Sequence, residues 1–265
     1  MNLDTQRIIE FEMVIPKCFQ ALSSVMPGVD ITMRDDLVLI CTKDYPSLDT
    51  NHAFLLRETP EKIDGLIDEV IAYFKAKDLP TMIMVSPACA PADLPQRLLQ
   101  RGFVRQEPDE CWLFLEHIQA RKAPKTDPRI VVKQVEKEDA RLFAETMVAA
   151  YEMPPEWVPI LEKALEPSIG HPSIDHYLAL IDQKPVATVT TMYHEEYVVV
   201  GSGGVLPEHR GSSLIFNLAV VALSRARDKG ADTILGQTVL GPRFERFMRI
   251  CGLKQAFKRQ TYILE

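Results

Sequence analysis

The chain has 265 residues, of which 46% are apolar and 25% charged, and its formal net charge is −7. This composition is typical of folded soluble proteins and excludes the collagen-like, disordered and disulfide-scaffold classes. The negative charge disfavours nucleic acid or an anionic membrane as a partner, because both need a positive protein surface. At roughly 150 residues per domain, one large or two small domains fit this length.

The cysteines give no sign of a metal site or a disulfide framework. All five lie outside any C-x-x-C pair, and their number is odd, so reduced thiols in a cytoplasm are the simplest interpretation. The N-terminus carries Asp4, Glu10 and Glu12 where a secretory signal would be apolar. The longest apolar stretches, such as 214–223, are half as long as the ~20 residues that a membrane span needs. We expect a cytoplasmic protein without a metal, and either a monomer or a homodimer.

One segment has the composition of a linker. Residues 117–128 read HIQARKAPKTDP, with two prolines, three Lys or Arg residues, and Ile118 as the only large apolar residue. This predicts two domains, residues 1–116 and 129–265, each of ordinary domain size.

Hydrophobic periodicity predicts the elements of both halves. In the first half we expect a helix, a strand, a helix and a final strand, over 63–77, 82–85, 93–101 and 111–116. The second half opens with a strand over 130–135 and helices over 138–150 and 154–165. An antiparallel meander follows, with strands over 177–181, 186–192 and 197–200. The chain then ends with a helix, a strand, a helix and a strand, over 213–229, 233–237, 242–250 and 260–265.

The two halves therefore end in the same order of elements. Gly102 and Gly252, which precede the two final strands, lie 150 positions apart, and Leu115 and Leu264 within those strands lie 149 apart. A nearly constant offset predicts an internal duplication. The alternative is that any two α/β halves look alike at this level of detail.

The segment most informative about chemistry is 198–223. Glycines at 201, 203 and 204 interrupt a strand, which marks either a bulge or a place where a ligand meets the backbone. A tight turn, PEHRG, leads to a helix that we expect to begin at Ser212 and Ser213, which are good capping residues. Such a helix end is suited to a phosphate or pyrophosphate, and Arg210 can add a charge-assisted bond. The alternative is an ordinary capped helix beside a surface arginine.

In this context the stretch VLPEHRGSS resembles the acyl-CoA-binding segment of the GNAT family of N-acetyltransferases, whose loop reads (Q/R)-x-x-G-x-(G/A). The resemblance covers about 129–265. It implies an α/β (α+β) fold with two GNAT-like repeats, each a mixed, mainly antiparallel twisted sheet flanked by helices. The first half looks like a degenerate repeat, with 53–56 and 61–78 in the corresponding places. Its loop over 57–61 has no glycine and two acids, which should repel a pyrophosphate.

The resemblance also implies roles for particular residues. The backbone of Gly203, Gly204 and Val205 would pair with the pantetheine arm of acetyl-CoA or another acyl-CoA, and the Val205 amide would stabilise the oxyanion. The pyrophosphate would be held by the six loop residues Arg210, Gly211, Ser212, Ser213, Leu214 and Ile215. Glu196, beside His194 and Glu195, falls near the place of the general base.

The sequence departs from the family at several of these positions. Ser213 and Ile215 stand where the family has glycine or alanine, and Met248 stands where a tyrosine often acts as general acid. Tyr262 is the only tyrosine in the final segment, and a core position explains it equally well. Cys251 can carry an acyl group in principle, although a packing thiol is the simpler interpretation.

The segment 151–157, YEMPPEW, occupies the usual place of the acceptor-binding loop in this family. Its acidic and aromatic residues, Glu152 and Trp157, suit a cationic amine; the alternative is a helix–helix corner with a packed tryptophan. The resemblance therefore implies an acyl-CoA-dependent N-acyltransferase that moves an acetyl group from acetyl-CoA to a small-molecule or peptide amine by direct transfer. The alternative is a non-catalytic GNAT-fold protein, either an acyl-CoA sensor or an interaction module.

Overall fold

The computed structural model describes residues 3–26, 28–42, 50–123, 125–211, 213–239 and 250–265. The first half of the chain supplies α1 (Thr5–Leu22), β1 (Val29–Met33), β2 (Val38–Thr42), β3 (His52–Phe54), α2 (Ile63–Lys75), β4 (Thr81–Val85), α3 (Leu94–Gln100) and β5 (Val104–Leu115). The second half supplies β6 (Ile130–Gln134), α4 (Ala140–Ala150), α5 (Trp157–Leu165), β7 (Ile174–Ile181), β8 (Lys184–His194), β9 (Tyr197–Val205), α6 (Leu214–Asp228), β10 (Thr233–Thr238) and β11 (Lys254–Leu264). The helix expected over 242–250 lies, except for its last residue, outside the described residues.

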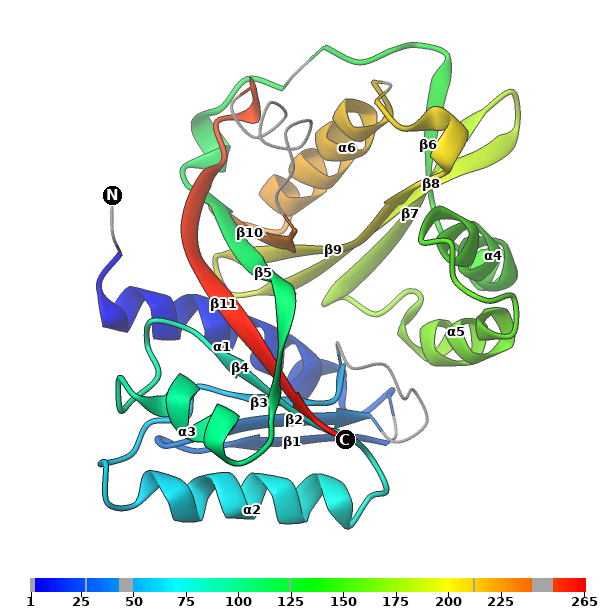
Figure 1. Cartoon of the computed structure of the whole chain (residues 1–265). Coiled ribbons are helices and arrows are strands. Elements are labelled where there is room, and N and C mark those ends of the chain that lie inside the picture. The colour runs from blue at the N-terminus through cyan, green and yellow to red at the C-terminus, as the bar shows by residue number, and fades with distance from the viewer. Residues whose placement is uncertain (1–2, 27, 43–49, 124, 212, 240–249) are drawn as a thin grey trace.

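Within the described residues, 11 strands form one sheet in the order β1-β2-β3-β4-β11-β5-β10-β9-β8-β7-β6 (Figure 1). Two neighbouring pairs are parallel, β3 with β4 and β9 with β10. The other pairs are antiparallel. The expected α/β class with a mixed, mainly antiparallel sheet is thus confirmed.

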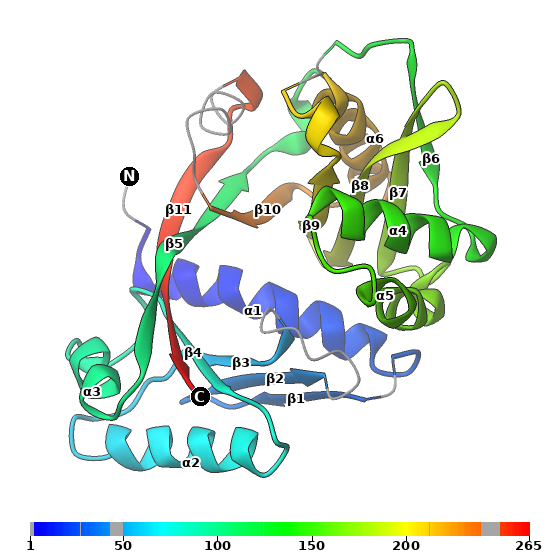
Figure 2. The ribbon, with the colours of Figure 1, turned by 45° about the vertical axis from the view of Figure 1, so that its right-hand side comes forward.

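The final strands of the two halves are exchanged. β11 pairs with β4 of the first half, and β5 pairs with β10 of the second half. β5 and β11 also pair with each other, and they cross the middle of the molecule side by side (Figures 1 and 2). Each half therefore completes its sheet with the last strand of the other, in the equivalent position.

α1 joins the two halves, although the hydrophobic pattern did not predict it. Asp4 caps the helix by accepting a hydrogen bond from the N–H of Arg7 at 2.8 Å. Phe11 is fully buried and contacts the rings of Phe114 and Tyr197, at centroid distances of 5.5 and 6.2 Å. Because Phe114 and Tyr197 belong to strands of different halves, α1 packs against both.

Helices cover both faces of each half. In the first half, α2 buries the apolar stripe Ile63, Leu66, Ile67, Val70 and Phe74 on the face of the sheet opposite α1 (Figure 2). In the second half, Phe143 of α4 packs with Leu178 of β7, whereas Leu214 of α6 packs with Ala179. Since successive residues of a strand point to opposite faces, α4 and α6 lie on opposite sides of the sheet.

The two exchanged strands are longer than the sequence predicts. We expected strands over 111–116 and 260–265, but β5 begins at Val104 and β11 at Lys254. Residues 104–106 are polar or exposed, yet they pair with β11. Apolar periodicity signals burial and not pairing, which explains the difference. Within the expected linker, Ile118 is fully buried against Leu115 and Val198. The boundaries 1–116 and 129–265 stay a prediction.

Candidate active site

β9 and β10 separate halfway along β9. β10 pairs with β9 only through Tyr197–Val200, whereas β8 follows β9 as far as Val205. The edge of residues 201–205 that faces β10 consequently has no strand partner within the described part of the chain. This open edge is the central feature of the site (Figure 2).

A β-bulge shapes the open edge. The register between β8 and β9 shifts where Thr188 pairs with Gly204 and Thr190 with Gly201. Ser202 has a φ of 48°, and its carbonyl accepts a hydrogen bond from the hydroxyl of Thr188 at 2.9 Å. The expectation that these glycines mark a bulge is confirmed. A Cβ atom placed on Gly201 or Gly203 would have no atom within 4 Å, so open space lies beside the backbone here.

Gly204 is a glycine for a different reason. A Cβ atom at this position would lie 2.8 Å from the Cβ of Ala150 and 3.1 Å from the ring of Tyr151. The C-terminal end of α4 therefore rests directly on the β9 backbone. Gly204 positions the segment that begins at Tyr151, which is the expected acceptor loop.

The backbone of Val205 faces the open edge. The N–H of Leu206 donates to the carbonyl of Val186 in β8 at 2.9 Å. Because the backbone groups of successive residues in a strand point to opposite edges, the N–H and C=O of Val205 point away from β8. The Nε of Arg210 donates to the Val205 carbonyl at 3.3 Å, which agrees with this direction.

Arg210 links the expected cofactor loop to the expected acceptor loop. Its Nη2 donates to the carbonyl of Ala150 at 2.8 Å and pairs with the carboxylate of Glu152 at 3.1 Å. Glu152 has a φ of 54°, so the chain turns sharply where α4 ends. The structure thus brings together two residues that the sequence assigned to separate roles, and it leaves the Arg210 side chain 43% exposed.

The loop before α6 has the expected arrangement of a glycine turn followed by the start of the helix. Gly211 has a φ of 86°, which favours glycine, and Ser213 is the N-cap of the helix. We expected the Ser213 side chain to cap the helix, but its hydroxyl makes no capping hydrogen bond. Leu214 is fully buried in the core, whereas Ile215 faces the cavity described next. Ser212 lies outside the described residues.

A cavity of about 1350 Å³ runs from the open edge of β9 toward the first half. One wall contains Gly201, Gly203, Val205 and Ile215, together with Tyr151. The far wall comes from α1, β3, β4 and β11 and includes Glu12, Phe54, Met84 and Arg259. Five methionines, Met82, Met84, Met147, Met153 and Met192, contribute to the lining. The cavity therefore suits a ligand with an apolar body.

Glu196 and Trp157, which the sequence placed at the site, are not among the residues that line this cavity. Glu196 is exposed in the β8–β9 turn, where its carbonyl accepts from the N–H groups of Asp232 and Thr233. It is separated from Val205 by the length of β9, roughly 30 Å at 3.3 Å per residue. Trp157 begins α5 and packs with Val148 and Leu161. This packing agrees with the alternative interpretation, a helix–helix corner with a packed tryptophan. The roles of both residues in catalysis or binding stay predictions.

Three residues were considered as a general acid or a nucleophile, and the structure places each of the two described ones differently. Met248 lies outside the described residues. Tyr262 is 2% exposed in the core of the first half, and its hydroxyl donates to Gln260 at 2.9 Å, which supports the core interpretation. Cys251 lines the cavity, but burial raises the pKa of its thiol to about 11, so a thiolate is scarce near neutral pH.

The corresponding place in the first half is closed. After β3, the carbonyl of Leu56 accepts from the N–H of Ala90 at 2.9 Å, and the N–H of Glu58 donates to the Ala90 carbonyl at 3.3 Å. Arg57 and Ala90 form a parallel bridge. These backbone bonds occupy the edge that stays open in β9, which agrees with a degenerate first repeat.

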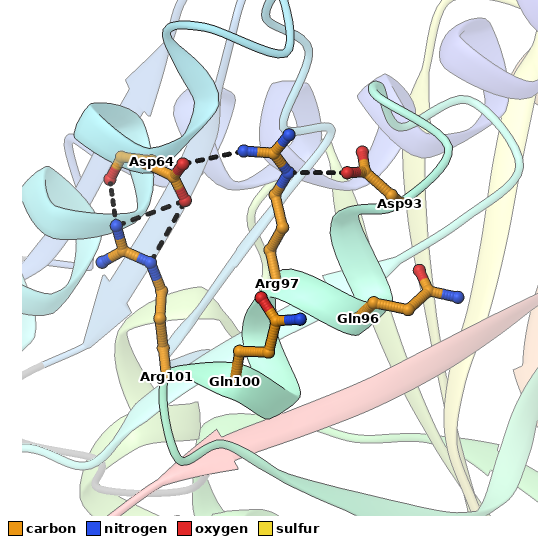
Figure 3. A pocket seen from close by; sticks show the side chains of 6 residues that line it. All are labelled: Asp64, Asp93, Gln96, Arg97, Gln100 and Arg101. Carbon is orange, nitrogen blue, oxygen red and sulfur yellow. Dashed lines mark hydrogen bonds and ion pairs between the residues drawn. The ribbon is translucent and has the colours of Figure 1, made fainter.

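A second, smaller pocket of about 320 Å³ lies between α2 and α3. Figure 3 shows that its charged side chains satisfy one another. Arg97 bridges Asp64 and Asp93 at 2.7 and 2.9 Å, and Arg101 pairs with Asp64 at 3.3 Å. We assign no ligand to this pocket. In the described part of the chain, no group of three or more His, Cys, Asp or Glu residues is arranged to hold a metal, and no helix has the length and apolar character to cross a membrane.

Comparisons with known proteins agree with this architecture. No protein-family model and no curated protein matches the sequence. Among solved structures, a GCN5-related N-acetyltransferase from Kribbella flavida is 17% identical, with 94% of this chain and 95% of that chain covered and a TM-score of 0.66. One from Sphaerobacter thermophilus is 14% identical, with 93% and 85% covered and a TM-score of 0.61. A tandem GNAT protein from the clavulanic acid biosynthesis pathway is 13% identical, with 90% and 84% covered and a TM-score of 0.59. The chain therefore has the fold of the GCN5-related N-acetyltransferases, and one of these three similar structures is a tandem protein.

Proposed function

We propose that the chain is an acyl-CoA-dependent N-acyltransferase whose cofactor binds in the second half, at the open edge of β9. The observation that carries this proposal is the separation of β9 from β10 beside a glycine-rich bulge. An unpaired strand edge offers backbone donors and acceptors to an extended ligand, as in strand addition. The pantetheine arm of an acyl-CoA is such a ligand, because it contains two amides.

The residues present fit this cofactor. The space beside Gly201 and Gly203 admits a ligand close to the backbone, and the outward N–H of Val205 is available to an acyl oxygen. The turn at Gly211 and the start of α6 direct backbone N–H groups and a positive helix dipole toward a pyrophosphate. Acetyl-CoA, when bound, supplies the activated acyl group. The chain's own part is to align the donor, stabilise charge at the Val205 N–H and hold the amine in the adjoining cavity.

Arg210 would change partners when the cofactor binds. Its contact with Glu152 neutralises the guanidinium, and a pyrophosphate with two negative charges is a stronger partner than one exposed carboxylate. Release of Glu152 would then leave a free carboxylate next to Tyr151 at the acceptor side of the cavity. Cofactor binding would thereby prepare the acceptor site.

A second candidate function is acyl-CoA binding without turnover. The position of Glu196, exposed at the far end of β9, favours it, because the expected base stands outside the cavity. This candidate shares the cofactor site but not the chemistry.

Calorimetry with acetyl-CoA, followed by turnover assays across a panel of primary amines, tests both functions. The enzyme requires saturable binding and release of free CoA that depends on the amine. Binding without CoA release from any amine supports the sensor instead. Absence of binding at millimolar acetyl-CoA to the folded protein would contradict both.

A further inference from the structure

A buried cluster of charged side chains lies at the far wall of the cavity. Glu12 of α1 is fully buried, and Arg259 of β11 is 2% exposed. Arg259 donates from Nε to the carboxylate of Glu110 in β5 at 2.6 Å, and its Nη1 lies 3.5 Å from Oε1 of Glu12. The guanidinium also packs 5.0 Å from the ring centroid of Trp112.

The cluster has two carboxylates for one guanidinium. Arg259 is committed to Glu110, whose Oε2 also accepts from the indole N–H of Trp112 at 3.1 Å. Oε2 of Glu12 accepts from the hydroxyl of Ser86 at 2.6 Å. Within the described residues, Oε1 of Glu12 accepts no hydrogen bond. The nearest cation to this oxygen, Nη1 of Arg259, lies 3.5 Å away and makes no hydrogen bond to it. A buried carboxylate oxygen that accepts no hydrogen bond is costly, so this atom is suited to a further cationic or donor group.

The surroundings indicate what kind of ligand would supply that group. Glu12, Glu110 and Arg259 all belong to the cavity wall, and Phe54, Met82 and Met84 surround them. Because Glu12 is fully buried, a ligand reaches its carboxylate only by moving neighbours, and methionine side chains are flexible enough to move. An apolar chain with a positively charged end satisfies both the lining and the carboxylate.

The cluster is too far from β9 to hold the nitrogen that would react there. The strand order β9-β10-β5-β11 places three strand spacings between β9 and Arg259, roughly 14 Å at 4.8 Å per spacing. We infer that the cluster of Glu12, Glu110 and Arg259 binds a cationic group at the distal end of an extended, largely apolar amine acceptor. That this ligand is the amine acceptor rests on the proposed function, whereas the cation site does not.

The electrostatics of the cluster agree with this assignment. Burial raises the pKa of Glu12 to about 7, although Arg259 and the Ser86 hydroxyl oppose the rise and Glu110 reinforces it. The thiol of Cys89, which Glu12 influences, also has a pKa raised by burial, to about 11, so it is uncharged near neutrality. Among the described residues, His52 of β3 is the remaining titratable side chain on this part of the wall. A bound ammonium would complete a neutral set of two carboxylates and two cations.

The two tryptophans of the chain make a direct test possible. With 5-fluorotryptophan, Trp112 reports on the cluster by fluorine NMR and Trp157 reports on α5, with Trp157→Phe assigning the signals. The probes are octylamine and the uncharged 1-octanol at about pH 8. We expect octylamine to shift the Trp112 signal saturably and to bind at least about tenfold more tightly than 1-octanol. Glu12→Gln should remove that preference, and the exposed Glu138→Gln should retain it.

Equal affinity for octylamine and 1-octanol in the native chain would overturn the inference, as would no saturable shift of Trp112. So would an unchanged preference in a folded Glu12→Gln variant. The native-chain comparison decides the matter even if that variant does not fold. Acetyl-CoA calorimetry on the same samples separates this outcome from the proposed function, because the two ligands occupy different walls. If turnover occurs, 1,8-diaminooctane should have a lower KM than octylamine only while Glu12 is present.

Discussion

The two halves of the chain differ at one strand edge, which follows β3 in the first half and forms the end of β9 in the second. In the first half, the chain after β3 is bonded to Ala90 through the backbone of Leu56 and Glu58. In the second half, β9 leaves β10 after Val200 and keeps an unpaired edge through the bulge. One edge is used for internal pairing, and the other stays available to a ligand. The two halves therefore have a comparable sheet, while only the edge of the second half is open.

The two halves are not independent of each other, because their final strands are exchanged. β5 completes the half that carries the open edge, and β11 completes the half that is closed. Neither half has its full sheet without the other. The closed first half is thus part of the structural support for the open second half.

The largest expected effect tests this exchange. Tyr262 of β11 is buried with Phe74 and Leu98 in the core of the first half. Tyr262→Ala should lower the free energy of unfolding by roughly 3–5 kcal/mol, because it leaves a large cavity. Hydrogen exchange should accelerate first in α2 and β4, although Tyr262 comes from the C-terminal half. Lys258→Ala, at an exposed position on the same strand, is the control. Faster hydrogen exchange confined to α6 and β9 would contradict the assignment of β11 to the first half.

The next effect concerns the buried carboxylate on the first-half side of the cavity. The pKa of Glu12 is raised from 4.5 to about 7. Between these values the unfolded chain ionises before the folded chain, so the folded state binds more protons and stability falls as pH rises. The loss is about 3 kcal/mol and is complete above pH 7. Denaturant titrations at about pH 5 and pH 8 measure it; Glu12→Gln should remove most of this slope, and an unchanged slope would contradict it.

Reversing the charge of one arginine in each half compares the loop before α6 with the loop after β3. Arg210→Glu should weaken acetyl-CoA binding about 100-fold, because it removes a charge-assisted bond and adds repulsion. Arg57→Glu, in the closed loop of the first half, should leave the affinity unchanged. Calorimetry measures both, with melting curves to show that Arg210→Glu is folded. A loss of affinity in Arg57→Glu alone would reverse the assignment of the halves.

The smallest expected effects come from substituting two neighbouring glycines of β9, one of which contacts α4 and one of which does not. A Cβ atom at Gly204 meets Ala150, whereas one at Gly203 meets nothing within 4 Å. Gly204→Ala should cost about 2 kcal/mol of stability through overpacking. Gly203→Ala should change stability little and weaken acetyl-CoA binding instead. Equal destabilisation by both substitutions would show that α4 does not rest on Gly204.

Local features were predictable from the sequence because local chemistry determines them. The 3.6-residue periodicity of 213–229 predicted α6, which spans Leu214–Asp228, and the strand glycines predicted the bulge. The offset of 150 between Gly102 and Gly252 indicates an internal duplication, which stays a prediction. This offset could not predict the exchange of final strands, because the sequence offset is the same whichever half a strand completes.

Features that depend on distant residues were missed. Glu12, Glu110 and Arg259 are separated by about 100 residues or more in sequence, so no spacing marks them as a cluster. The pairing of Arg210 with Glu152 depends on α4 resting against Gly204, which no periodicity reveals. The family resemblance drew attention to Glu196, but the length of β9 separates it from Val205.

Hydrogen exchange with and without acetyl-CoA tests most directly whether one open edge defines the site. Saturating acetyl-CoA should slow exchange of the amides over 201–205 and 213–216. The corresponding first-half amides, over 53–62, should keep their rates. Slower exchange over 53–62 with no change over 201–205 and 213–216 would contradict the assignment of the cofactor site to the open edge of β9.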